Sequence, residues 1–108
     1  MSEAGMIKVL IVEPQKDPYS KEIDNELKPL QDIVGGYLER VTINNRIVAL
    51  FNEDGLSLNL EKNSSIVHQR FGKIDIVGTY LFAAHDGNGE FVSLTDEDIR
   101  LCLSCILP

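Results

Sequence analysis

Cys102 and Cys105 carry the most reactive side chains in the sequence, and two residues separate them. This C-x-x-C spacing occurs in redox pairs and supplies half of many tetrahedral zinc sites. The pair falls near the end of a predicted helix, however, where the helix dipole disfavours a thiolate. A zinc site would also need His68 and His85, and neither histidine has a second ligand at a metal-like spacing. We therefore interpret both cysteines as small apolar packing residues, and we predict no metal site and no cofactor.

The sequence contains none of the motifs that carry common enzyme chemistry. It has no nucleophile elbow, P-loop, dinucleotide fingerprint or H-E-x-x-H. His85 adjoins a glycine-rich turn, where polar residues are expected in any case. The acidic runs also have local explanations, because Glu53-Asp54 falls in a predicted turn and Asp96-Glu97-Asp98 at a predicted helix start. We predict no catalytic residue and no enzymatic activity.

The net charge of the chain is −7, from 17 acidic and 10 basic side chains. Proteins that bind nucleic acids present basic patches to the phosphates, so direct binding of DNA or RNA is disfavoured. An acidic protein is instead steered toward basic partners, including the nucleic-acid-binding grooves of other proteins. Asp96, Glu97 and Asp98 are our candidate partner-binding residues. The alternative is that the charge merely keeps a small protein in solution.

Gly78-Thr79 interrupts an otherwise bulky β-forming run. A glycine within a strand often marks a bulge, or a place where a ligand or another backbone approaches closely. Arg70 lies near it in the sequence, and Arg46 adds charge from a predicted hairpin turn. With Asn59 and Thr79, these arginines would suit a phosphate or a nucleotide, because the guanidinium fork pairs with phosphate oxygens. The alternative is a bulge that accommodates a packed helix.

The first half of the chain predicts strand, helix and hairpin in that order. Met6–Val12 is a nearly continuous apolar run that favours a buried central strand, and Tyr19–Ile23 follows as a short extended piece. A helix begins near Asn25 or Glu26, capped by Asp24 or Asn25, with an apolar stripe of Leu27, Leu30, Ile33 and Val34. Gly35-Gly36 ends this helix, since glycine adopts the left-handed conformation without strain.

A β-hairpin follows, with strands at Arg40–Ile43 and Arg46–Phe51. Asn44-Asn45 between them predicts a two-residue turn of the primed type. Asn52–Gly55 is the next predicted turn, with positive φ at its glycine. From Leu56 to Phe71 polar and apolar residues mix, and we expect a surface loop with a short helical turn. Ile74–Ala84 predicts a second strand, interrupted at Gly78.

The last predicted element is a helix with Thr95 as its N-cap and Asp98 as the answering residue of a capping box. Ile99, Cys102, Leu103 and Ile106 share one face, which predicts that the helix packs on a sheet. The order of elements favours the α+β class: a small mixed or antiparallel sheet with a central β-hairpin, packed by two helices. At 108 residues we expect one domain, 1–108, with residues 1–5 as a disordered tail.

The apolar runs are too short to cross a membrane, and the N-terminal residues lack the pattern of a signal peptide. We therefore expect a cytoplasmic protein that binds no membrane.

Two segments resemble a known family. Leu30–Glu39 reads LQDIVGGYLE, and Asp75–Thr79 reads DIVGT. Both are similar to segments of a domain of unknown function found in small proteins of bacteriophages, plasmids and Gram-positive bacteria, and the resemblance extends from Met6 to about Ile106. The chain departs from the family at Glu61-Lys62, where an arginine is expected soon after Leu58-Asn59. The resemblance brings no catalytic residues with it.

The family context implies a binding protein. Our preferred expectation is a non-enzymatic, acidic counter-defence inhibitor of a phage or mobile element, which binds and blocks a host component such as a nuclease or CRISPR effector. The first alternative is a small-molecule binder that sequesters a nucleotide immune signal, in which Arg46, Arg70 or Thr79 converge in a cleft or at a homo-oligomer interface. The second alternative is a housekeeping protein of a mobile element.

Overall fold

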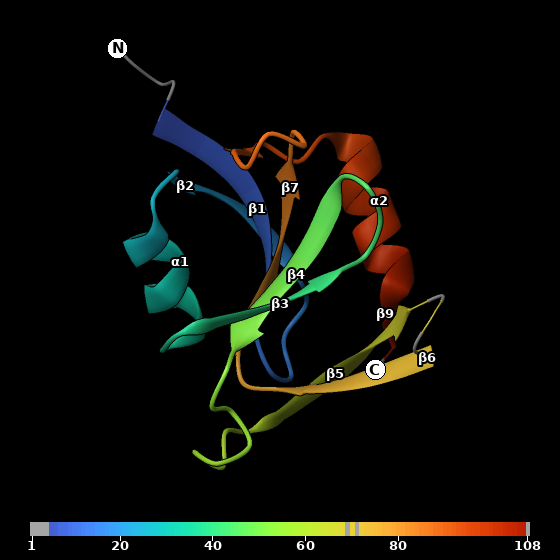
Figure 1. The fold of residues 1–108 in the computed structure, drawn as a ribbon. Coiled ribbons are helices and arrows are strands. Elements are labelled where there is room, and N and C mark those ends of the chain that lie inside the picture. Colours follow the sequence, from blue (N-terminus) through green and yellow to red (C-terminus); the bar gives the residue numbers. More distant parts are fainter. Residues whose placement is uncertain (1–4, 69, 71, 108) are drawn as a thin grey trace.

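Runs of isoleucine, valine and leucine form the central strands of a six-stranded sheet (Figure 1). The computed structural model describes residues 5–68, 70 and 72–107. In this part of the chain the strand order is β2-β1-β7-β4-β3, and β8 pairs with β7. The strands are β1 (Met6–Val12), β2 (Tyr19–Asp24), β3 (Leu38–Thr42), β4 (Ile47–Asn52), β7 (Tyr80–His85) and β8 (Phe91–Val92). The prediction of a buried central strand at Met6–Val12 is confirmed, because β1 lies between two neighbours.

A second sheet of three strands crosses below the first in Figure 1. Its order is β6-β5-β9, formed by β6 (Gly72–Val77), β5 (Lys62–His68) and β9 (Ile106–Leu107). All strand pairs in the described part of the chain are antiparallel. The chain passes from β6 of the small sheet into β7 of the large sheet through Gly78-Thr79.

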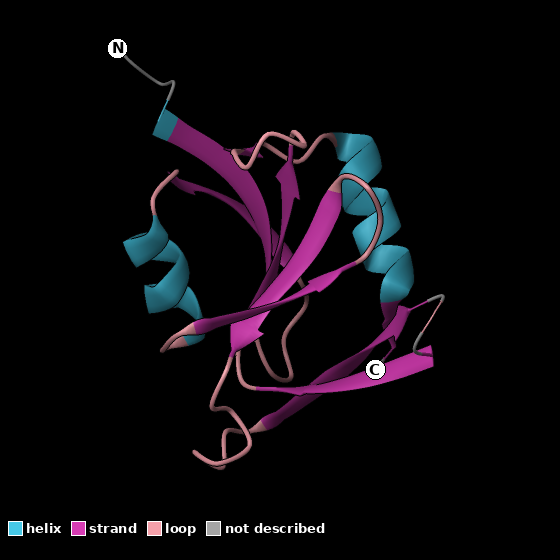
Figure 2. Ribbon diagram, viewed as in Figure 1, coloured by secondary structure: helices cyan, strands magenta, loops and turns pink. Residues whose placement is uncertain are grey.

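The central strands β1, β4 and β7 are covered on both faces of the large sheet, which explains why they are apolar at nearly every position, whereas the edge strands β2 and β3 are mostly polar and exposed. On one face Val9 and Leu81 share an apolar cluster with Leu30 and Val34 of α1 (Leu27–Val34). On the other face a second apolar cluster joins the large sheet to Ile66 and Ile76 of the small sheet and to Cys102 of α2 (Asp96–Cys105). Figure 2 shows α1 on one side of the large sheet, and α2 and the small sheet on the other.

The helix ends are only partly as expected. Gly35 ends α1 with φ +82°, and the N–H groups of Gly35 and Gly36 both donate to the Gln31 carbonyl, so the predicted stop is confirmed. The predicted cap is wrong: Glu26 is the N-cap and caps with no side chain, while the Asn25 amide donates to the Phe91 carbonyl instead. Leu27 also leaves the predicted stripe, since it is 60% exposed.

The capping box of α2 is confirmed in both directions. The Asp98 N–H donates to Thr95 Oγ1 at 3.1 Å, and the Thr95 N–H donates to Asp98 Oδ2 at 2.8 Å. Cys102 is buried and Ile99 half-buried as predicted, but Leu103 is 44% exposed. Ile106 lies beyond the helix in β9.

Two predicted turns differ from the structure. Neither Asn44 nor Asn45 has a positive φ, so the primed two-residue turn is wrong. Asn44 Oδ1 instead accepts the N–H groups of Arg46 and Ile47, at 2.8 and 2.7 Å, and closes a longer loop. Gly55 also lacks a positive φ; it is required because a Cβ there would stand 2.9 Å from Val77 Cγ2.

The expected surface loop from Leu56 to Phe71 is wrong from Lys62 onward, where β5 begins; Phe71 itself lies outside the described residues. The polar residues misled the prediction because the side chains of Asn63, Ser64 and Ser65 each form hydrogen bonds to other parts of the structure. Asn63 Nδ2 donates to the carbonyls of Val12 and Gly78, at 3.0 and 2.8 Å. The single strand predicted over Ile74–Ala84 is two strands of different sheets, and Gly78 between them is a link rather than a bulge.

The fold is therefore a compact unit with two helices and antiparallel strands, as expected in outline. Packing by two helices is only partly confirmed, because the small sheet shares the second face of the large sheet with α2. Residues 1–4 of the expected tail lie outside the described residues, whereas the Gly5 carbonyl accepts a hydrogen bond from the Asn25 N–H.

Candidate binding groove

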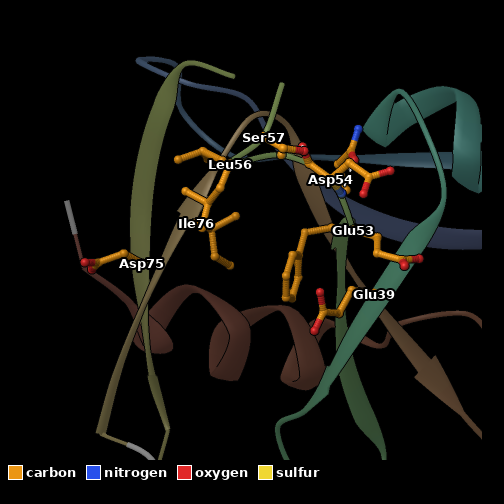
Figure 3. A pocket seen from close by; sticks show the side chains of 11 residues that line it. Glu39, Glu53, Asp54, Leu56, Ser57, Asp75 and Ile76 are labelled. Atoms are coloured by element: carbon orange, nitrogen blue, oxygen red, sulfur yellow. Dashed lines mark hydrogen bonds between the residues drawn. The ribbon is translucent and has the colours of Figure 1, made fainter. Parts of the chain in front are cut away.

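A groove with a volume of about 280 Å³ opens between β3 of the large sheet and β6 of the small sheet. Among the described residues its lining includes four acidic residues, Glu39, Glu53, Asp54 and Asp75, and no lysine, arginine or histidine. Phe51, Leu56 and Ile76 supply an apolar part of the lining. We call this feature the acidic groove (Figure 3).

The two strands place an acidic residue on each side of the groove, but only the side chain on β3 points into it. Glu39 lies on β3 directly across from Phe51 of β4, and Figure 3 shows its side chain pointing into the groove toward Ile76. Asp75 lies on β6 with its carboxylate turned away from the groove, because side chains alternate along a strand and Ile76 takes the inner position. The Ser65 hydroxyl donates to Asp75 Oδ1, and this bond lowers the pKa of the Asp75 carboxyl below its ordinary value.

Asn52 holds the loop that carries the other two carboxylates. Its side-chain amide is buried; Nδ2 donates to the Val34 carbonyl at 3.1 Å, and Oδ1 accepts the Asp54 N–H at 2.8 Å. One residue thus joins the end of α1 to the turn after β4. These two hydrogen bonds hold Glu53 and Asp54 at the rim of the groove.

The loop then turns back on β6 and exposes an apolar side chain. Gly55 allows the backbone to pack against Val77, the last residue of β6. Leu56 follows with 81% of its surface exposed, although it lines the groove. Leu56 thus adds an exposed apolar side chain beside Glu53 and Asp54 at the rim of the groove.

The structure does not bring the four predicted anion ligands together. Asn59 precedes β5 and Arg70 follows it, so they lie at opposite ends of the β5–β6 hairpin. Thr79 lies at the link to β7, near the Asn59 end. Arg46 lies on the β3–β4 loop, where its guanidinium is already bound by a carboxylate. None of the four lines the acidic groove.

The carboxylate that binds Arg46 is Asp98, one of the three candidate partner-binding residues. Arg46 Nε donates to Asp98 Oδ2 at 2.9 Å and to Oδ1 at 3.1 Å. Burial acts to raise the pKa of Asp98, but hydrogen bonds from Thr95 and Arg46 outweigh it, and the pKa lies below its ordinary value. Asp98 is therefore a structural residue as well as a cap. Asp96 and Glu97 are exposed on the first turn of α2.

Both cysteines belong to the apolar packing, His68 joins the two sheets, and His85 ends β7. Cys102 and Cys105 are free thiols, and burial raises the pKa of Cys102 to about 12. His68 lies on β5 and joins the two sheets, since its Nε2 is 2.8 Å from the Thr42 carbonyl and its Nδ1 accepts the Arg70 N–H. Among the described residues there is no cluster of three or more metal-ligating side chains.

Two further pockets have less distinct chemistry. One, of about 390 Å³, lies beside the β1–β2 loop, where Lys16 and Lys62 are balanced by Glu13 and Asp17. The other, of about 380 Å³, is open and lies at the end of α1 beside Tyr37. The acidic groove differs from both because all of its charged lining residues carry the same sign.

Glu39 and Asp75 have no role in the prediction from sequence, because they lie far apart in the chain and meet only through the packing of two sheets. The acidic pair Glu53-Asp54 was the one feature of the sequence that could have pointed to this groove. A turn explains why polar residues occur there, but not why two carboxylates occur beside an exposed leucine.

Two packed antiparallel sheets, two helices and an acidic surface groove define a small α+β domain. Residues 7–105 match the family described as Domain of unknown function (DUF3846), and the chain belongs to this family. No curated protein and no solved structure matches the chain. None of the helices in the described residues is long and apolar enough to span a membrane.

Proposed function

We propose that this chain is a non-enzymatic binding domain that docks a basic protein in the acidic groove. The observation that carries the proposal is the composition of the groove: among the described residues its lining combines Glu39, Glu53 and Asp54 with an apolar patch and includes no basic residue, while Asp75 lies on the outer face of β6. A partner with lysine or arginine beside an apolar side chain would pair with both parts. The overall charge of −7 would steer such a partner toward the domain.

The class of partner we propose is a nucleic-acid-binding protein of a host cell, such as a nuclease or a CRISPR effector. Such proteins carry basic grooves that receive phosphates. Carboxylates at the rim of a small acidic domain can occupy the same grooves and block them. The domain would then act as a counter-defence inhibitor encoded by a phage or another mobile element and would work in the cytoplasm.

A nucleotide-binding role receives less support. Arg46 is engaged by Asp98, and Asn59 and Arg70 lie at opposite ends of a hairpin, so one phosphate cannot reach all of them in one copy of the chain. The acidic groove would repel a nucleotide.

The test is capture from a lysate of the source cell with three forms of the domain, followed by mass spectrometry. The parent domain should retain a basic protein, and Glu39→Gln with Glu53→Gln should lose it. Asp96→Asn with Glu97→Gln removes the same number of charges from α2 and should retain it. Equal retention by all three forms, or loss only with the α2 variant, would contradict docking in the groove.

A further inference from the structure

The acidic groove lies along the free edge of a strand. β6 pairs with β5 on one side, and among the described residues no strand pairs with its other side. The groove lining includes three consecutive residues of β6 but none of β5, so the groove follows the unpaired side. An edge of this kind presents backbone N–H and C=O groups to any extended segment that reaches it.

We propose that the groove receives an extended basic segment of the partner, which adds as a strand to the free edge of β6. This inference rests on the proposed function and specifies its binding mode. Backbone hydrogen bonds would supply affinity, and alternate side chains would supply specificity. Within the small sheet the order would become partner-β6-β5-β9.

The side chains around the edge define the chemistry of the segment. Ile76 faces inward and Asp75 outward, so alternate residues of an added strand would meet these two environments. Inward residues would lie over Ile76 and Phe51, which favours apolar side chains such as valine. The outer face of β6 also carries Lys73, which forms an ion pair with Asp75 at 4.0 Å, so lysine or arginine is favoured only directly opposite Asp75. The groove therefore selects a segment in which basic and apolar residues alternate.

A second copy of this chain is a poor occupant of the same edge. Pairing of two β6 strands would bring together two grooves that each hold Glu39, Glu53 and Asp54, in molecules that each carry a charge of −7. Like charges directly opposite each other destabilise a strand pair. The charge of the groove and of the whole chain thus favours a basic partner over self-association.

The probe is a seven-residue peptide of alternating lysine and valine with blocked ends, titrated at low salt and followed by amide signals in NMR. In a strand, the valine N–H groups point to one edge and the lysine N–H groups to the other. We therefore compare peptides N-methylated at all valines or at all lysines. One of the two should bind about tenfold more weakly than the parent peptide, because its donors to β6 are lost, and the other should bind within about threefold. Amide exchange should slow within Lys73–Ile76 of β6.

The outcomes distinguish strand addition to β6 from docking of a basic segment by charge alone. If both methylated peptides bind like the parent peptide, while Glu39→Gln with Glu53→Gln still weakens binding, strand addition is wrong and docking by charge stands. If that protein variant binds the parent peptide as tightly as the unaltered domain, the groove itself is wrong. Failure of the lysine-valine peptide to bind at millimolar concentration, or equal binding of a glutamate-valine peptide, would overturn strand addition to β6.

Discussion

A Cβ placed on Gly36 would stand 2.9 Å from Nδ2 of Asn52. The Asn52 side chain connects the end of α1 to the loop at the rim of the acidic groove through two hydrogen bonds. The two glycines after α1 thus have separate tasks. Gly35 adopts φ +82° and ends the helix, whereas Gly36 leaves room for the Asn52 amide to reach the Val34 carbonyl. The family-like segment is therefore explained by packing around a buried amide.

Gly36→Ala should destabilise the domain by about 1–3 kcal/mol, because the new methyl group displaces Asn52 and leaves a buried carbonyl without its partner. Urea unfolding measures the change. Gly5→Ala is the matched control, since a Cβ there meets nothing within 4 Å. In a double-mutant cycle the effects of Gly36→Ala and Asn52→Ala should be less than additive, since both break the same bond. Full additivity would contradict the assignment.

Gly35→Val tests the helix stop itself. A β-branched residue at positive φ is strained by about 1–3 kcal/mol, so the thermal unfolding midpoint should fall. An unchanged midpoint would show that the backbone at Gly35 relaxes without cost.

The Arg46–Asp98 pair should make stability depend on pH in the acid range. The pKa of Asp98 is lowered in the folded state, so its contribution is present above the unfolded value of about 4 and is lost as pH falls through the folded value. Asp98→Asn should cost about 1–3 kcal/mol at pH 7, because it removes charged hydrogen bonds from a buried position. Its loss of stability between pH 5 and pH 2 (a window of about three units) should be smaller than that of the parent. Asp96→Asn, at an exposed position, serves as the control and should follow the parent curve.

Cys102 should resist alkylation. Burial keeps its thiol neutral, with a pKa of about 12, whereas Cys105 is half-buried. Iodoacetamide at mildly alkaline pH should modify Cys105 first and Cys102 only when the domain unfolds, as read by peptide mass spectrometry. Cys102→Ser with Cys105→Ser should lower stability and leave binding unchanged. Equal alkylation rates, or stoichiometric zinc in the purified protein, would contradict the packing role.

Leu56 separates binding from folding. Its side chain is 81% exposed, so Leu56→Ala should change the free energy of unfolding by no more than about 0.5 kcal/mol. The same variant should weaken capture of the partner, because Leu56 lines the acidic groove. Unchanged affinity would remove Leu56 from the binding surface, and a large loss of stability would show that it packs within the fold.

Local signals predicted local structure well. The apolar run of β1, the glycine stop at Gly35 and the Thr95 cap each depend on neighbouring residues, and all three are confirmed. The errors arise where contacts between residues far apart in the sequence determine the local structure. Asn63 reads as a loop residue, but it lies in β5 because the Val12 and Gly78 carbonyls need a donor.

In the candidate site, too, local features were predictable from the sequence and contacts between distant residues were not. The sequence predicted Asp98 as a capping residue and a candidate partner contact, but it gave no sign of the ion pair with Arg46 on the β3–β4 loop. Glu39 and Asp75 line the same groove only because the two sheets cross. The spacing of residues in the sequence does not predict that crossing. The charge of −7 agrees with the acidic lining of the groove, but it does not predict where in the fold the groove lies.

The most direct test of the acidic groove is the affinity of the captured partner for two protein variants that carry equal changes in charge. Glu39→Gln with Glu53→Gln should weaken binding about tenfold or more in calorimetry, mainly through a slower, less salt-dependent association. Asp96→Asn with Glu97→Gln should change affinity less than about threefold, because α2 lies outside the groove. The reverse order of effects, or binding of the parent domain that does not depend on salt, would contradict the account.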